Sequence, residues 1–281
     1  MAIRRPAVAG AFYAASPEKL RKQIIDCFIH PLGPGRLPES KYESNILSVV
    51  CPHAGYIYSG PAAAHSYLAL AEQAIPDTVI IIGPNHTGWG TPVSIMSEGV
   101  WKTPLGELTI DSEHAGKILE YADTARSDES AFIREHSIEV QLPFLQFIYP
   151  DFKFVPICMG YQDLDTSVEL GQAIHEASAD KNIIIVASSD LTHQEPKDSA
   201  NKKDSYVLDA IRAMDERQLQ DSVQRHHITT CGYGPISVAL VYSKLRNATG
   251  AEVLSYYTSG DIVGDNRAVV GYASAKITRN W

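Results

Sequence analysis

Three histidines of this 281-residue sequence stand where side chains able to bind a metal ion are expected. His53, His86 and His193 each come shortly after a short run rich in valine and isoleucine, the pattern of a strand buried on both faces. The carboxyl ends of parallel strands meet at one edge of a sheet, so the loops that follow such strands converge there. Neutral imidazole is the commonest metal ligand in proteins. We therefore expect the three rings to share one site at the rim of a parallel sheet.

Cys231 is the candidate for a third ligand. It stands immediately before a helical pattern that runs from Pro235 to Leu245. A cysteine near a helix N-terminus and a cation is favoured as thiolate, the form that binds metal. Two histidines and a third ligand on one face leave positions open for water or substrate. On these grounds alone, a small buried packing residue explains Cys231 equally well. The other cysteines are predicted to be core residues: Cys27, Cys51 and Cys158.

Further polar and aromatic side chains are expected around this site. Asp190 comes three residues before His193 and is a candidate to orient that imidazole or to fix the turn. Ser137 is predicted to be the N-cap of a helix, so His136 projects from the entrance of that helix. The residues expected to line the pocket are Phe12, Tyr13, Tyr58, His136 and His227.

The scaffold follows from the alternation of apolar runs with amphipathic segments. Strands are predicted at 46–51, 78–83, 154–159, 183–187, 253–258 and 268–276, and helices at 62–73, 113–122, 137–149, 167–177 and from Pro17, with Ser16 as N-cap. Val93–Met96 and Glu107–Ile110 flank the turn Thr103–Gly106 and are predicted to form a hairpin added to the sheet. This order favours a single three-layer α/β domain, with a largely parallel, mixed central sheet and helices on both faces.

Composition excludes several classes of function. The formal net charge is -9, so there is no basic field that would hold a nucleic-acid backbone. No stretch approaches the roughly 18 apolar residues that a membrane span needs. The four cysteines lie far apart, without a dense disulfide framework, which favours reduced thiols and a cytoplasmic protein.

Seven short motifs, taken in order and spacing, resemble those of the Memo family. They are Arg5-Pro6-Ala7-Val8-Ala9-Gly10-Ala11-Phe12-Tyr13, Pro52-His53-Ala54-Gly55-Tyr56, Gly83-Pro84-Asn85-His86, Thr103-Pro104-Leu105-Gly106, Glu135-His136-Ser137-Ile138-Glu139, Ser188-Ser189-Asp190 with His193, and Cys231-Gly232. Each motif is weak alone, but the set is specific and spans nearly the whole chain. The family includes prokaryotic members called AmmeMemoRadiSam system protein B. The resemblance predicts one Memo-like domain over residues 1–281.

The resemblance implies a fold related to class III extradiol dioxygenases of the protocatechuate 4,5-dioxygenase β-subunit type. Those enzymes hold Fe(II) with two histidines and a glutamate, and use a further histidine as acid and base. By motif, His53 and His86 match the histidine ligands, His193 matches the catalytic histidine, and Cys231 stands where the glutamate would be. The resemblance also implies that the segment Thr258–Asp265 is a loop bordering the crevice.

Three hypotheses about function follow. The first, which the resemblance implies, is a metal-dependent redox protein that binds iron or copper. Zinc is a further candidate, because a thiolate in place of a carboxylate favours softer metals. The second is an extradiol-type dioxygenase with an unusual ligand set. The third is a non-enzymatic module that binds a peptide or a small molecule in the crevice.

Overall fold

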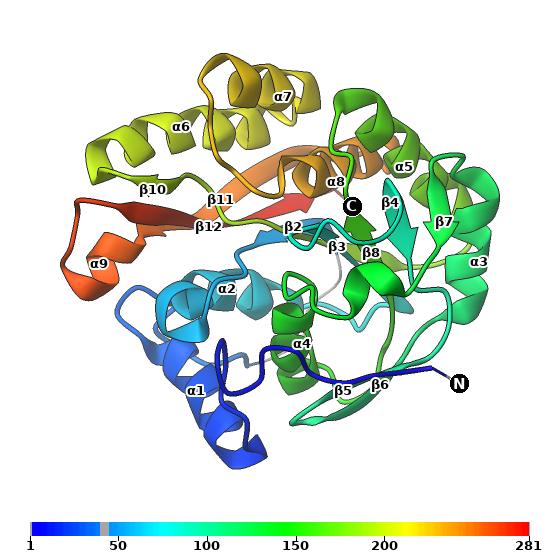
Figure 1. The fold of residues 1–281 in the computed structure, drawn as a ribbon, viewed down its shortest axis with the longest axis horizontal. Helices are drawn as coiled ribbons and strands as arrows, with labels where there is room; N and C mark the ends of the chain where they lie inside the picture. The colour runs from blue at the N-terminus through cyan, green and yellow to red at the C-terminus, as the bar shows by residue number, and fades with distance from the viewer. Residues whose placement is uncertain (1, 40–44, 281) are drawn as a thin grey trace.

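A mixed sheet of nine strands forms the middle layer of the computed structural model, which describes residues 2–39 and 45–280 (Figure 1). The strands are β1 (Ile3–Arg4), β2 (Ile46–Cys51), β3 (Thr78–Pro84), β4 (Val93–Ile95), β5 (Val100–Thr103), β6 (Gly106–Thr109), β7 (Ala125–Ser127), β8 (Lys153–Met159), β9 (Ile183–Ser188), β10 (His193–Glu195), β11 (Gly250–Thr258) and β12 (Val269–Thr278). The helices are α1 (Pro17–Ile29), α2 (Tyr56–Ala71), α3 (Ser112–Tyr121), α4 (Leu142–Ile148), α5 (Leu164–Ala177), α6 (Lys197–Ala213), α7 (Glu216–Arg225), α8 (Tyr233–Leu245) and α9 (Ser259–Val263), with 3-10 turns η1 (Ser130–Phe132) and η2 (Glu139–Gln141). Within the described residues, no helix is long and apolar enough to cross a membrane.

The sheet is parallel at its centre and antiparallel where further strands join it. Its order is β10-β12-β2-β9-β3-β8-β4-β7, and β11 also pairs with β12. The strands β2, β9, β3 and β8 run parallel to one another, whereas β12 is antiparallel to β2 and β4 is antiparallel to β8. The predicted mixed α/β sheet is therefore confirmed, and the carboxyl ends of its central strands meet at one edge.

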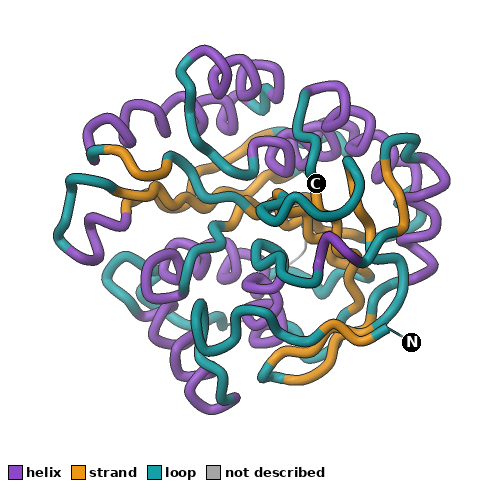
Figure 2. The backbone as a smooth tube through the Cα atoms, in the orientation of Figure 1, coloured by secondary structure: helices purple, strands orange, loops and turns teal. Residues whose placement is uncertain are grey.

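Helices cover both faces of the sheet because the central strands are apolar on both sides (Figures 1 and 2). In β3, Ile80 and Ile82 pack with residues of α3 and of α5 to α8, whereas Val79 and Ile81 pack with residues of α1, α2 and α4. Successive side chains of a strand point to opposite faces, so an uninterrupted apolar run supplies both cores. The three-layer prediction is confirmed in this way.

The predicted hairpin was assigned to the wrong first strand. The strand β4 pairs with β7 and β8 inside the main sheet. The hairpin partner of β6 is instead β5, and the two form a separate three-stranded sheet with β1. The short strands β4 and β5 both precede the turn at Thr103–Gly106, and β5, which leads directly into the turn, pairs with β6.

Two further local predictions were wrong. The helix predicted from Ser137 begins as the turn η2, and α4 carries Pro143 in its first turn. The hydroxyl of Ser137 donates to the carbonyl of Pro84 (3.2 Å) instead of capping a helix. The segment after β11 is the short helix α9, not a loop, because Thr258 and Asp261 form a capping box at its start.

A buried ion pair links the N-terminal strand β1 to the turn η2. The guanidinium of Arg4 pairs with Glu139 and also donates to the backbone carbonyls of Phe132 and Glu135. The Glu139 carboxylate accepts as well from two backbone N–H groups, those of residues 7 and 8, and from the Tyr13 hydroxyl (2.6 Å). The side chains of Arg4 and Glu139 are 5% and 0% exposed, so each buried charge is stabilised by the opposite charge of its partner.

We predict that Glu139→Ala lowers the free energy of unfolding by about 3–5 kcal/mol, because it leaves the Arg4 guanidinium buried without a partner charge. Urea unfolding monitored by circular dichroism measures this. Glu113→Ala is the control, since Glu113 pairs with Lys117 on the surface of α3 and its loss should leave stability unchanged. Equal midpoints for the two variants would contradict the prediction.

Candidate metal centre

The side chains of His53, His86 and Cys231 meet at the carboxyl edge of the sheet. His53 follows β2, His86 follows β3, and Cys231 precedes α8. Their ligand atoms lie within 4.8 Å of one another. The two rings meet edge to face with centroids 5.2 Å apart, and Cys231 Sγ lies 3.2 Å from His53 Nε2. Residues far apart in the sequence thus form one group of two nitrogens and one sulfur.

The spacing of these atoms suits one metal ion. Metal–nitrogen bonds of about 2.0–2.1 Å and a metal–sulfur bond of about 2.3 Å place tetrahedral nitrogen and sulfur ligands about 3.6 Å apart. The 3.2 Å between Cys231 Sγ and His53 Nε2 lies close to that value. Small side-chain rotations therefore suffice for the three atoms to share an ion.

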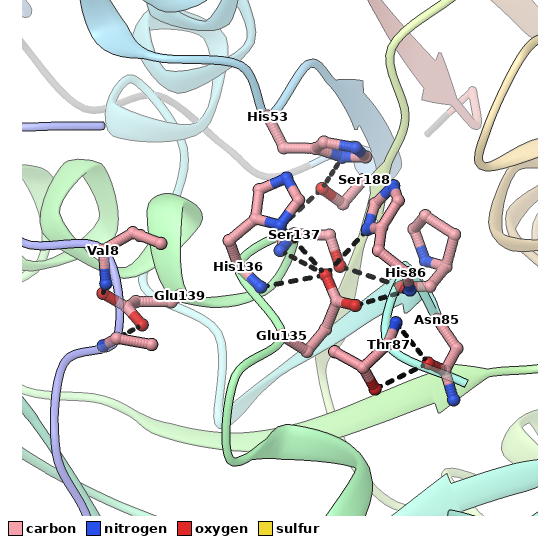
Figure 3. Close-up of polar contacts among 12 residues, drawn as sticks. Val8, His53, Asn85, His86, Thr87, Glu135, His136, Ser137, Glu139 and Ser188 are labelled. Carbon is pink, nitrogen blue, oxygen red and sulfur yellow. Dashed lines mark hydrogen bonds and ion pairs between the residues drawn. The ribbon is translucent and has the colours of Figure 1, made fainter. Parts of the chain in front are cut away.

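Glu135 fixes the orientation of His86 (Figure 3). One carboxylate oxygen accepts from His86 Nδ1 (2.9 Å) and from the backbone N–H groups of His136 and Ser137, and the other accepts from the backbone N–H of His86 (2.7 Å). An ionised carboxylate only accepts, so His86 Nδ1 carries a proton, and in the neutral ring Nε2 presents a bare lone pair. Figure 3 also shows that Glu139 points away from this group, toward Val8.

The role of Glu135 was missed at the level of sequence. The residue was present in one of the motifs that carry the Memo resemblance, and that was the only signal available. Glu135 also belongs to a second group able to hold a metal, with His86 and His136. Its carboxylate already accepts four hydrogen bonds from the protein, so the geometry favours a supporting role over ligation.

The charges of the group are set by burial and by Glu135. Burial lowers the pKa of His86, but the hydrogen bond and charge of Glu135 outweigh it and raise the pKa above its ordinary value. Burial raises the pKa of Glu135, but hydrogen bonds from His86 and the backbone bring it to about 2. Burial, and then repulsion from His136, His86 and His193, holds the pKa of His53 well below its usual range. His53 is therefore neutral, as a ligand must be.

Without a bound cation, the surroundings of Cys231 disfavour its thiolate form. Burial, followed by the charge of Asp190, raises the pKa of the Cys231 thiol. The proximity to α8 does not offset these two effects, so the side chain is a thiol until a cation displaces its proton.

Asp190 fixes the turn at His53 rather than the ring of His193. Its carboxylate accepts from the backbone N–H of His53 (2.7 Å), and its own N–H donates to Cys231 Sγ (3.3 Å). Burial raises the pKa of Asp190 to about 6, although the His53 N–H and the charge of His193 lower it in part. The carboxylate of Asp190 therefore holds the backbone of His53, a role that the sequence did not suggest.

His193 lies beside the group on β10, with its ring fixed by Thr229. The Thr229 carbonyl accepts from His193 Nδ1 (3.0 Å), which leaves Nε2 unprotonated in the neutral ring. A bulge separates His193 from Glu195, and the residue between them, Gln194, has φ of 59°. Bulges of this kind redirect a side chain out of the regular strand pattern.

The residues expected to line the pocket divide into two sets. The His136 ring lies 4.7 Å from Phe12 and 4.6 Å from His86, between centroids, and burial lowers its pKa to about 4. Tyr58 packs in a small apolar cluster with Ala54, beside His53, and Ile262 of α9 belongs to the same cluster. Phe12 and His136 therefore lie beside the group, whereas Tyr58 packs in the cluster that holds the neighbour of His53.

Tyr13 and His227 lie elsewhere. Tyr13 is only 2% exposed and its hydroxyl donates to Glu139, so it belongs to the core that fastens the N-terminal segment. His227 is exposed in the turn after α7, where its carbonyl accepts from Lys203 Nζ (3.1 Å). Its proximity to Cys231 along the sequence was misleading, because the chain turns between them.

The fold and this group define an α/β protein with two histidines and a cysteine at the carboxyl edge of a mixed sheet. The family model described as "Memo-like protein" matches residues 4–276. A MEMO1 family protein from Methanopyrus kandleri is 49% identical, over 98% of this chain and 99% of that protein. One from Methanobrevibacter smithii is 47% identical, over 97% and 98% respectively. The chain belongs to the Memo family.

A solved structure supports the fold independently. The crystal structure of an uncharacterized protein from Escherichia coli K12 superposes with a TM-score of 0.59 and covers 82% of this chain and 99% of that one. The sequence identity is 14%, so the likeness concerns the fold alone.

We predict that Glu135→Gln lowers the pKa of His86, because the carboxylate charge and the strong hydrogen bond are what raise it. Proton NMR titration of the metal-free protein measures this pKa. Glu129→Gln serves as the control, since Glu129 is an exposed carboxylate just before η1, on the same segment, and does not bond to His86. An unchanged His86 titration in Glu135→Gln would contradict the assignment.

Proposed function

We propose that this Memo-family protein binds one metal ion through His53, His86 and Cys231 and acts as a metal-dependent redox protein. The observation that carries the proposal is the convergence of three ligand atoms within 4.8 Å from three separate elements. The orientation of His86 supports it, because Glu135 holds a proton on Nδ1 and thereby makes Nε2 the lone-pair nitrogen of the neutral ring. A packing cluster would need neither feature.

The donor set points to iron or copper, with zinc as a further candidate. A thiolate is a soft ligand and two imidazoles are intermediate, which favours copper(I), zinc or iron over magnesium or calcium. Iron or copper held there would supply one-electron redox chemistry. His53 and His86 supply neutral nitrogens, and Cys231 supplies the only negative charge among the three.

His193 is proposed as the acid and base of the site. Thr229 holds the Nδ1 proton, so the neutral ring offers Nε2 to accept a proton from a bound substrate. Asp190 contributes by holding the backbone of His53 in place. The substrate class proposed is a small molecule or a peptide that reaches the rim beside His136 and Phe12.

The proposal also places the protein in the cytoplasm, since all four cysteines are free and free thiols persist in a reducing compartment. An extradiol-type dioxygenase is less well supported, because the carboxylate beside His86, that of Glu135, already accepts from His86 and the backbone. The direct test is the metal content of untagged protein purified without chelator, measured by inductively coupled plasma mass spectrometry.

We predict that Cys231→Ser weakens metal binding strongly, because a ligand itself is lost. The loss of affinity should exceed the roughly 10–100-fold that follows when a ligand only loses its hydrogen-bond partner. Metal titrations give the dissociation constants. Cys27→Ser is the matched cysteine control, and His193→Ala is the control at the rim; both should bind metal like the wild type.

Equal metal content in the wild type, Cys231→Ser and the double variant His53→Ala/His86→Ala would contradict the proposal. The non-enzymatic binding module would then become the better account of this crevice.

A further inference from the structure

A buried relay of hydrogen bonds lies behind His53, on the side opposite Cys231. His53 Nδ1 lies 2.8 Å from the hydroxyl of Ser188, the last residue of β9. The same hydroxyl is 2.7 Å from the carbonyl of Ser137 and 2.8 Å from Gln141 Nε2. Ser188 is fully buried, so these three neighbours are its hydrogen-bond partners.

The direction of each bond in this relay follows from what each group is able to donate. The carbonyl of Pro52 accepts from Gln141 Nε2 (3.1 Å), and the Tyr67 hydroxyl donates to the Gln141 amide oxygen (2.6 Å). The nitrogen end of the amide therefore faces Ser188 and donates to it. A carbonyl only accepts, so the single hydroxyl proton of Ser188 goes to Ser137.

His53 Nδ1 must then be the donor to Ser188. In the opposite direction, the Ser188 hydroxyl would donate to His53 and no longer to the Ser137 carbonyl. The remaining donor to that carbonyl in the relay would be Gln141 Nε2, at 3.5 Å. This distance is too long for a hydrogen bond of ordinary strength. A buried acceptor left without a partner costs about 1–3 kcal/mol. With Nδ1–H donating, every group in the relay is satisfied, and Nε2 is bare toward Cys231.

We infer that Ser188, held by Gln141, is a positioning residue that fixes the His53 tautomer and so makes Nε2 available to a metal ion. The inference rests on the proposed metal site for its functional meaning, but the tautomer itself is a property of the metal-free protein. In both His53 and His86, a hydrogen bond at Nδ1 directs Nε2 toward the metal site, but the acceptor differs. A neutral hydroxyl serves His53, and the carboxylate of Glu135 serves His86.

The tautomer is tested first in the metal-free wild type. Long-range nitrogen–proton correlation spectra of protein labelled with ¹⁵N-histidine distinguish a protonated from a bare ring nitrogen. We expect His53 to carry its proton on Nδ1, and a proton on Nε2 overturns the inference. This result does not depend on whether the protein binds metal.

The positioning role is tested with the pair Ser188→Thr and Ser188→Val. The two side chains have nearly the same shape, so they disturb the packing equally and differ in the hydroxyl. Cobalt(II) is the probe, because its absorption reports a bond to sulfur and its titration gives a dissociation constant. Ser188→Val should bind cobalt roughly 10–100-fold more weakly than Ser188→Thr, the usual effect of losing such a partner.

Controls separate this effect from a general loss of stability. Ser48→Ala removes another fully buried hydroxyl, which bonds to Ser243 within the same core, and should leave cobalt affinity unchanged. Ser188→Ala replaces the Val variant if that variant does not fold. Equal affinity in the Thr and Val variants overturns the positioning role. A wild type that binds no cobalt contradicts the proposed function, while the NMR result still decides the tautomer.

Discussion

An imidazole that binds a metal must present a bare nitrogen, and the proton on its other nitrogen then needs an acceptor. This constraint explains most of the polar groups beneath the candidate site. Glu135 accepts a hydrogen bond from His86 Nδ1, and Ser188 accepts one from His53 Nδ1. Each acceptor is held in turn by further hydrogen-bond donors. The acceptors stand on elements other than those that carry the histidines, so the site requires the assembled fold.

The layered fold was largely predictable because its signal is local. The runs that became β2, β3, β8 and β9 are apolar at successive positions, which is the pattern expected of strands buried on both faces. The rule that parallel strands end at a common edge predicted that His53 and His86 would converge. Cys231 follows no strand, and it became a candidate ligand through its place before α8 and through the family resemblance. The hairpin was less predictable, because β4 and β5 are both short and either one fits the same turn pattern.

The electrostatics of the site could not be predicted, because they arise from contacts between distant segments. Proximity to α8 suggested a thiolate at Cys231, but burial and Asp190 act in the opposite direction. Glu135 meets His86 across 49 residues, and Ser188 meets His53 across 135. Neither pairing leaves a periodic pattern, so only the folded chain reveals which carboxylate and which hydroxyl serve the histidines.

The ion pair between Arg4 and Glu139 has a consequence for how the protein is made. The two residues are separated by 135 positions, so the first strand has no partner charge until the middle of the chain has left the ribosome. Cys231 is 178 residues from His53 and emerges later still. A nascent chain therefore presents His53 and His86 well before Cys231, and the three-donor site closes only after Cys231 has emerged.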